Sequence, residues 1–299
     1  MGKAAVTRLR DTLKDELKLL NTLNVLKQIA IAEYQYLDSE RRQASAFLRV
    51  LRTFFRFYHE IRLEDSLFVR NPCQDPAVVV LTSDEGFTGN LNAQIIDRAA
   101  RRHDENPATQ VVVLGRRGAL RLAELGVPAV EFEGIGLPLG YSAVSPLKPF
   151  LLDQYLNQKI GSATIIYARC QSFTRQTLEE SRVLPFHEAD ITGADDGSLG
   201  EMPVAPRGLT IIEPDIRKIV DYTIALWFGR RLYELFWESK LSEVANRSIE
   251  LSERHERLSR QRGRTLSRYF RASHEVIDAG IREVFASHAQ GLRTREEEE

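Results

Sequence analysis

The sequence predicts an α/β protein in which two long terminal helices form an antiparallel coiled coil and flank an inserted doubly wound α/β domain. Residues 215–288 contain no proline, residues 3–71 contain neither proline nor glycine, and short apolar runs lie between the two stretches. A helix of about seventy residues would be on the order of 100 Å long, which no single compact domain of this size accommodates. We therefore expect an N-terminal coiled-coil helix in residues 1–70, an α/β domain in 71–212 and a C-terminal coiled-coil helix in 213–299.

The first helix is expected over residues 4 to about 62. Its apolar residues recur at steps of three or four, which is typical of a coiled-coil strand. The alternative is two shorter amphipathic helices packed on the middle domain. The expected apolar positions in the first part are Leu9, Leu13, Leu17, Leu20 and Leu23.

The middle of the chain alternates between strand-like and helix-like segments. Asn71–Pro76 ends the first helix, and continuous apolar runs such as Ala77–Leu81 are typical of buried parallel strands. Strands alternating with helices indicate a doubly wound layer. The expected strands are 77–81, 110–115, 128–132, 163–168 and 175–184, with helices to about 103 and over 116–125 and 146–157. Residues 192–206 are expected to be a loop, and 209–212 a last short strand.

The last helix begins at Glu213-Pro214-Asp215 and is expected to run to His288. Gly263 lies inside it, where glycine costs roughly 1 kcal/mol relative to alanine, and could mark a bend. The expected apolar positions include Leu258, Leu266, Tyr269, Val276 (or Ile277), Ile281, Val284 and Phe285. The acidic end, residues 295–299, is expected to fray.

Composition excludes several classes of protein. The formal net charge is −1, so no overall field favours nucleic acid or anionic lipid. The two cysteines give neither a disulfide framework nor metal-ligand spacing, and a reduced, cytosolic setting is the simplest interpretation. A charged helix follows the N-terminus where a signal peptide would be apolar, and no apolar run approaches the roughly 20 residues of a membrane span. Any membrane contact is therefore expected through a partner.

No catalytic, cofactor or metal site is predicted. The turn Ser83–Gly89 follows a strand and precedes a helix, where glycine-containing loops can bind phosphate. It lacks the Lys-Ser/Thr pair of a P-loop, and Asp84 and Glu85 would repel an anion. The favoured interpretation is a tight turn held by its own Asp and Thr side chains. The six histidines are not spaced as helix-borne metal ligands, and no nucleophile–base or paired-carboxylate arrangement can be argued.

A concentration of arginines marks one part of the last helix. The arginines fall on several faces, so the expected feature is a basic collar that meets acidic partners. The alternative is a solvated helix with ion pairs such as Glu250–Arg254 and Glu253–Arg257. The arginines are Arg247, Arg254, Arg257, Arg260, Arg262, Arg264, Arg268 and Arg271.

Together these segments resemble the γ subunit of F-type ATP synthases, over nearly the whole chain. The family's last helix has a Glu-Pro-Asp-like start, a tyrosine matched by Tyr233 and a Ser-Glu-x-x-Ala-Arg-like element matched by 242–247. Its late Tyr-Asn-Lys/Arg-Ala signature is matched by Tyr269–Ala272, and its Ser-Asp-x-Gly-Leu-x-Gly-x-Leu-Asn turn by Ser83–Asn92.

The chain departs from the family pattern in the turn, at the end of the N-terminal run and at polar positions near the C-terminal tip. Asn90 replaces the second glycine of the turn, and Glu33 replaces a lysine that ends the family's N-terminal run. Near the C-terminal tip, Ser273-His274 replaces Arg-Gln and Ala279-Gly280 replaces Gln-Glu. Small residues there are consistent with a tip of low grip, and the resemblance implies a divergent γ subunit, as in an alternative F-type ATPase.

The resemblance implies the central rotor shaft of an F1Fo ATP synthase or ATPase, not itself catalytic and without cofactors. Expected partners are the α and β subunits of the α3β3 ring, the ε subunit and the c-ring, at the cytoplasmic face of a bacterial inner membrane. The alternatives are a coiled-coil scaffold or regulator with the same fold, and a nucleotide-binding α/β enzyme. The expected partner contacts are Asp84, Gly86, Gly89, Glu243, Arg247, Arg254, Arg257, Arg260, Arg264, Arg268, Arg271, Ser273 and His274.

Overall fold

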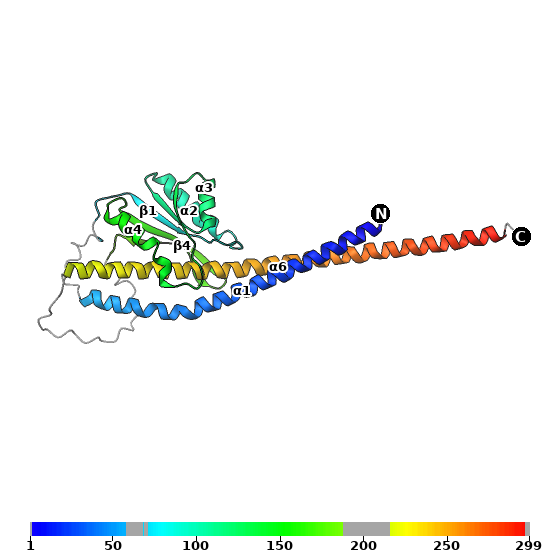
Figure 1. Ribbon diagram of the computed structural model, residues 1–299, viewed down its shortest axis with the longest axis horizontal. Coiled ribbons are helices and arrows are strands. Elements are labelled where there is room, and N and C mark those ends of the chain that lie inside the picture. The colour runs from blue at the N-terminus through cyan, green and yellow to red at the C-terminus, as the bar shows by residue number, and fades with distance from the viewer. Residues whose placement is uncertain (1, 58–67, 69–70, 188–215, 297–299) are drawn as a thin grey trace. The chain divides into compact units, whose positions relative to one another are not determined.

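The computed structural model describes residues 2–57, 68, 71–187 and 216–296 (Figure 1). The expected loop at 192–206, the expected strand at 209–212 and the helical stretch expected after residue 57 lie outside the described residues. The chain forms two compact units, one of residues 1–29 with 248–299 and the other of residues 30–247.

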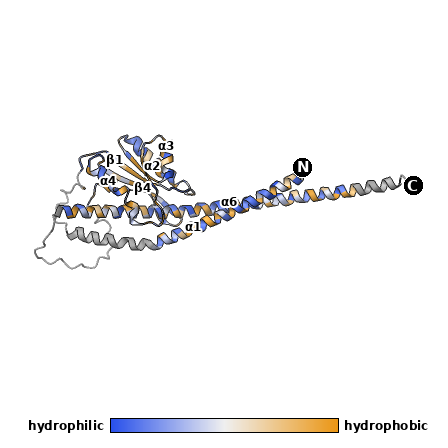
Figure 2. Ribbon diagram, in the orientation of Figure 1, coloured by the Kyte–Doolittle hydropathy of each residue, from blue (hydrophilic) through white to orange (hydrophobic). Residues whose placement is uncertain are grey.

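Both terminal segments are single helices. α1 spans Gly2–Phe57 and α6 spans Ile216–Glu296, 56 and 81 residues long, so the prediction of two long terminal helices is confirmed. α6 continues through Gly263, where an added Cβ would meet nothing within 4 Å. Polar and apolar residues are interspersed along α6 (Figure 2), as expected for a helix that buries an apolar stripe and exposes its other faces.

The first unit pairs the start of α1 with the later part of α6 in antiparallel directions. The α1 residues that face inward recur in steps of three and four: Val6, Leu9, Leu13, Glu16, Leu20, Leu23 and Lys27. Glu16 is 4% exposed and Leu17 is 43% exposed, so the expectation that Leu17 lies in the seam was wrong. The alternation of three- and four-residue steps of a coiled coil places residue 16, not 17, against α6.

A polar contact fills the position where the leucines were expected. Gln261 Nε2 and Thr265 Oγ1 donate hydrogen bonds of 3.0 and 3.1 Å to Glu16 Oε1. Thr265 is buried and Leu266 is exposed, so the same one-residue error applies to α6. A buried polar group on a coiled-coil seam favours one register, because any slip leaves it without its partners.

The second unit contains a mixed five-stranded sheet in the order β3-β2-β1-β4-β5. β1 pairs in parallel with β2 and β4, and β2 pairs in parallel with β3, as a doubly wound layer requires. β5 runs antiparallel to β4, so the sheet closes with a hairpin. The strands are β1 (Pro76–Leu81), β2 (Gln110–Leu114), β3 (Ala129–Phe132), β4 (Ser162–Ser172) and β5 (Arg175–Leu184).

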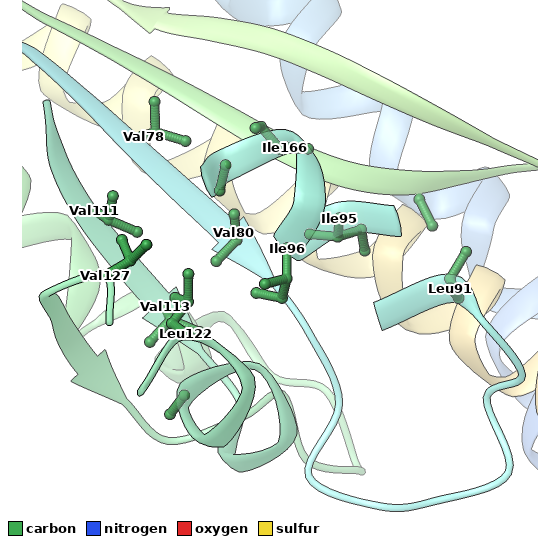
Figure 3. Close-up of a cluster of buried hydrophobic side chains, with 13 residues drawn as sticks. Val78, Val80, Leu91, Ile95, Ile96, Val111, Val113, Leu122, Val127 and Ile166 are labelled. Carbon is green, nitrogen blue, oxygen red and sulfur yellow. The ribbon is translucent and has the colours of Figure 1, made fainter. Parts of the chain in front are cut away.

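The helices of this domain connect the parallel strands. They are α2 (Leu91–Glu105), α3 (Arg116–Glu124) and α4 (Leu147–Leu156), with a short 3-10 helix at Tyr141–Val144. Alternate residues of β1 and β2, such as Val78, Val80 and Val113, point into a core that α2 and α3 close (Figure 3). Ile96 of α2 and Leu122 of α3 pack into the same core. The valine-rich strands favour this buried position because β-branched side chains pack well on a pleated surface.

The part of α6 in the second unit is buried on most of its circumference. Phe228, Leu232, Leu235 and Phe236 are all buried. Trp227 packs edge-to-face on Phe186, 5.0 Å between ring centroids, and the hydroxyl of Tyr233 donates to the carbonyl of Leu139 at 3.1 Å. A helix that is apolar on most faces is stable only as a core element, so this stretch of α6 belongs to the α/β domain's core.

Candidate partner-contact surfaces

Five of the α6 arginines share one exposed face. At about 100° per residue they lie within an arc of roughly 80°, about 130° away from the half-buried positions that face α1. The side chains of these five arginines are exposed, so five of the eight arginines form one outward-facing line. We call this line the arginine stripe: Arg257, Arg260, Arg264, Arg268 and Arg271.

The arginines along this part of α6, from Arg254 to the end of the arginine stripe, differ in charge compensation. Arg254, Arg257 and Arg260 pair with Glu250, Glu253 and Glu256 at 3.0–3.6 Å, each four residues earlier. Arg264, Arg268 and Arg271 have no carboxylate within 4 Å in the part of the chain that the structure describes. A solvated helix with such ion pairs was the alternative to a basic collar. That alternative holds for Arg254, Arg257 and Arg260 only. The uncompensated positive charge is concentrated in Arg264, Arg268 and Arg271.

The far part of α6 presents large apolar side chains to solvent. Phe270, Ile277, Ile281 and Phe285 are between 49% and 72% exposed. Ile281 and Phe285 were expected in the buried seam, and that expectation was wrong. Of the two alternatives left open one turn earlier, Val276 is half-buried and Ile277 is exposed. Ser273 is half-buried and His274 is exposed beside them. An exposed apolar row of this length indicates a surface that a partner covers.

The turn after β1 is held by hydrogen bonds from more than one element. Asn92 Nδ2 donates to Ser83 Oγ at 2.7 Å and to Thr88 Oγ1 at 3.2 Å. Asp84 Oδ1 accepts from the backbone nitrogen of Arg116 at 2.8 Å, so it holds the start of α3 and not its own turn. Phe87 adopts φ +63° and is partly exposed, and Gly89 adopts φ +56°. The fixed turn presents Phe87 outward, while Gly86 lies against the Arg117 side chain.

Glu243 and Arg247 are buried, although the sequence placed them among exposed partner contacts. Both belong to an ion network inside the second unit. Burial raises the pKa of the Glu243 carboxyl, and the neighbouring cations Lys240 and Arg247 oppose that shift. This burial could not be predicted from residue types, since a charged residue on a helix is usually solvated.

A cavity of about 570 Å³ lies at the carboxyl ends of β2 and β3. Ligands of doubly wound domains bind at this edge of the sheet. The described residues that line the cavity include Glu131 and Glu133 but neither lysine nor arginine, so its charge does not favour a nucleotide's phosphates. Among the described residues, no three His, Cys, Asp or Glu side chains are grouped to hold a metal ion. Within the same residues, no helix is long and apolar enough to cross a bilayer.

Comparison with known proteins identifies the family. The sequence model of the family described as ATP synthase matches residues 9–289. The chain belongs to the ATP synthase gamma-chain family. It is 24% identical to the ATP synthase gamma chain of Thermosynechococcus vestitus over 308 residues, covering 94% of this chain and 96% of that one. It is 21% identical to the gamma chain of Clostridium beijerinckii over 252 residues, covering 83% and 84% of the two chains.

Solved structures share the fold of this gamma chain. A chain of the Euglena gracilis mitochondrial ATP synthase (OSCP/F1/c-ring, rotational state 3) matches with a TM-score of 0.68 at 16% identity, covering 96% of this chain and 94% of that one. A chain from the rotor of the same enzyme in rotational state 1 matches with a TM-score of 0.61 at 16% identity, covering 92% and 99%. The combination of two long helices and a central mixed sheet is therefore the gamma fold.

Proposed function

We propose that this chain is the central shaft of a rotary F1Fo ATP synthase or ATPase. The observation that carries the proposal is the family match over residues 9–289, which includes almost all of both long helices. Members of this family are non-catalytic subunits of the ATP synthase complex. Nucleotide chemistry accordingly belongs to partner subunits, in line with the absence of cationic side chains among the described residues that line the main cavity.

The two units suit different parts of that task. The first unit is a two-helix coiled coil whose register is favoured by the Glu16–Thr265 contact, which suits a stiff rod inside the α3β3 ring. The second unit, with its sheet and the buried part of α6, would take up rotation from the c-ring together with the ε subunit. As an asymmetric shaft turns, each β subunit meets a different face of it, and this shifts the populations of the β conformations.

The arginine stripe is proposed to face acidic segments of the β subunits. Arg264, Arg268 and Arg271 lie on the exposed face of α6 without carboxylates of their own among the described residues. Guanidinium groups bind carboxylates in a bidentate geometry and stay charged at all physiological pH values. The exposed apolar row at Phe270, Ile277, Ile281 and Phe285 would be covered by the same ring.

The chain is proposed to be peripheral to the membrane, at the cytoplasmic face of a bacterial inner membrane. Curated relatives such as those of Thermosynechococcus vestitus and Clostridium beijerinckii are bacterial, which supports this setting. The altered tip positions Ser273, His274, Ala279 and Gly280 support a divergent shaft, as in an alternative ATPase.

The experiment that tests the proposal is affinity purification of the tagged chain from detergent-solubilised membranes of its native host. Recovery of α and β subunits in about threefold excess over the chain, together with ATPase activity, is the expected result. Recovery of the chain alone, or with unrelated proteins, would show that it is a scaffold that retains the fold and joins no rotor.

A further inference from the structure

One buried arginine joins three segments of the second unit. The Arg247 guanidinium on α6 contacts Glu85 Oε2 of the β1–α2 turn at 2.8 Å and Glu33 Oε2 of α1 at 3.8 Å. It also pairs with Glu243 on its own helix, and Lys240 Nζ lies 3.0 Å from Glu243 Oε1. Arg247 is therefore the meeting point of α1, α6 and the turn that follows β1.

The contacts of Arg247 are short-range and partly shielded from water. Its side chain is 8% exposed, whereas that of Glu85 is 71% exposed. Three carboxylates face two cations, Arg247 and Lys240, so the local charges are nearly balanced. Removing one partner of a buried ion pair leaves a poorly compensated charge, and this makes each remaining contact more important. The cluster resists separation of the three segments.

The residue before Arg247 holds the other half of the same turn. Asn246 Nδ2 donates a hydrogen bond to the carbonyl oxygen of Thr88. Two consecutive α6 side chains thus fix Glu85 and Thr88, which lie on either side of the left-handed Phe87. The turn begins where β1 ends, and β1 is the central strand of the sheet. Fixing the turn therefore ties the centre of the sheet to α6.

The link to α1 depends on Glu33, whose carboxylate carries the charge opposite to that of Arg247. By the resemblance described above, Glu33 stands where the family's N-terminal run ends in lysine. A lysine there would place a second cation against Arg247, and the attraction would become repulsion. The next residue of α1, Tyr34, packs edge-to-face on Phe173 of the β4–β5 turn, 4.9 Å between ring centroids.

We propose that Arg247 is a positioning residue that transmits torque between the α/β domain and both shaft helices. This role rests on the proposed shaft function and names the place where twisting of the sheet is passed to α1 and α6 together. Arg247 is also the last α6 residue of the second unit. Glu85 and Glu33 are the two ends of this clamp, and each acts through its contact with Arg247.

The test compares Glu85→Gln and Glu33→Gln with Glu124→Gln. Glu124 is a matched control because it forms an exposed ion pair with Arg121 at 2.8 Å, remote in sequence from the clamp. In the tagged chain, hydrogen exchange of the amides at 84–90 should accelerate about tenfold in Glu85→Gln, the effect of losing one charge-assisted hydrogen bond. Glu124→Gln should leave those amides unchanged.

The functional readout uses the complex in lipid vesicles with a potential-sensitive dye. The membrane potential formed per ATP hydrolysed should fall in Glu85→Gln and Glu33→Gln, while the hydrolysis rate and subunit composition stay as in the wild type. A merely structural role would not separate these two quantities. Unchanged exchange at 84–90, or an unchanged potential per ATP, would overturn the torque role. If the wild-type chain recovers no α and β subunits, the shaft proposal fails first, and the torque role fails with it.

Discussion

The arginine stripe gives the sharpest test of how the shaft meets its ring. Arg264, Arg268 and Arg271 lie on one face of α6 without carboxylate partners among the described residues, whereas Arg254, Arg257 and Arg260 each have a glutamate at 3.0–3.6 Å. We predict that replacing the unpaired arginines, Arg264, Arg268 and Arg271, by glutamine weakens binding of the chain to the α3β3 ring. Replacing the paired arginines, Arg254, Arg257 and Arg260, by glutamine should weaken this binding less. Each of them must give up its own glutamate before it can bind a carboxylate of the ring.

The size of the effect follows from the exposure of these side chains. An exposed ion pair contributes about 0.2–1 kcal/mol, so three pairs together contribute about 0.6–3 kcal/mol, or a roughly threefold to hundredfold change in Kd. The assay is a titration of the isolated ring with each variant chain. Rising salt should reduce the difference between wild type and variant, since screening acts over about 10 Å at 0.1 M. Equal losses in the two triple variants, or a loss only in the paired set, would refute the proposed role of the uncompensated arginines.

Two further predictions concern the stability of the two units. Gly118→Ala should destabilise the second unit by about 1–3 kcal/mol, because a Cβ there would collide with Thr82 Oγ1 and lie 2.9 Å from Val113 Cγ2. The control is Gly263→Ala, where the added Cβ lies in open space on α6. This control should stabilise its helix by about 0.5–1 kcal/mol. Thermal unfolding followed by circular dichroism measures both, and equal signs would contradict the packing described. Glu180 lies between Arg98 and Arg102; burial raises the pKa of its carboxyl, but the two arginines outweigh burial and leave that pKa below its usual range. Its carboxylate therefore stabilises the fold above the unfolded pKa of about 4.3, and the contribution is lost as pH falls through the folded pKa. Glu180→Gln should lower the free energy of unfolding by about 1 kcal/mol at pH 7 and by progressively less in acid. Denaturant titrations at several pH values measure this difference, and a difference that does not change with pH would contradict the reasoning.

Much of the fold could be predicted because local patterns and tertiary packing agree. The valine runs at 77–81 and 110–115 are strands because β-branched residues and burial favour the same state. The coiled-coil phase could not be predicted, since Glu16 and Leu17 both fit a three- or four-residue step. The structure places the glutamate inward, where Thr265 and Gln261 bind it. Periodicity reports spacing, but the choice between neighbouring residues depends on the partner helix.

The candidate surfaces were predicted less well, for a related reason. A sequence shows that an arginine is charged, but its burial depends on which segments pack around it. Arg247 and Arg264 belong to the same cluster, yet one is buried among three carboxylates and the other is exposed. Spacing alone left Val276 and Ile277 as alternative seam residues, and the structure half-buries Val276 and exposes Ile277. These positions depend on non-local packing, which a pattern of residue types does not determine.

The shaft role is tested most directly by watching the chain turn. The complex would be fixed to a surface through its β subunits, with a visible probe on an exposed residue of the α/β domain such as Lys159, and ATP would then be added. The shaft account predicts that the probe rotates continuously in one direction as long as ATP is hydrolysed. A probe that stays still, or only fluctuates about one position, in complexes that hydrolyse ATP would contradict it.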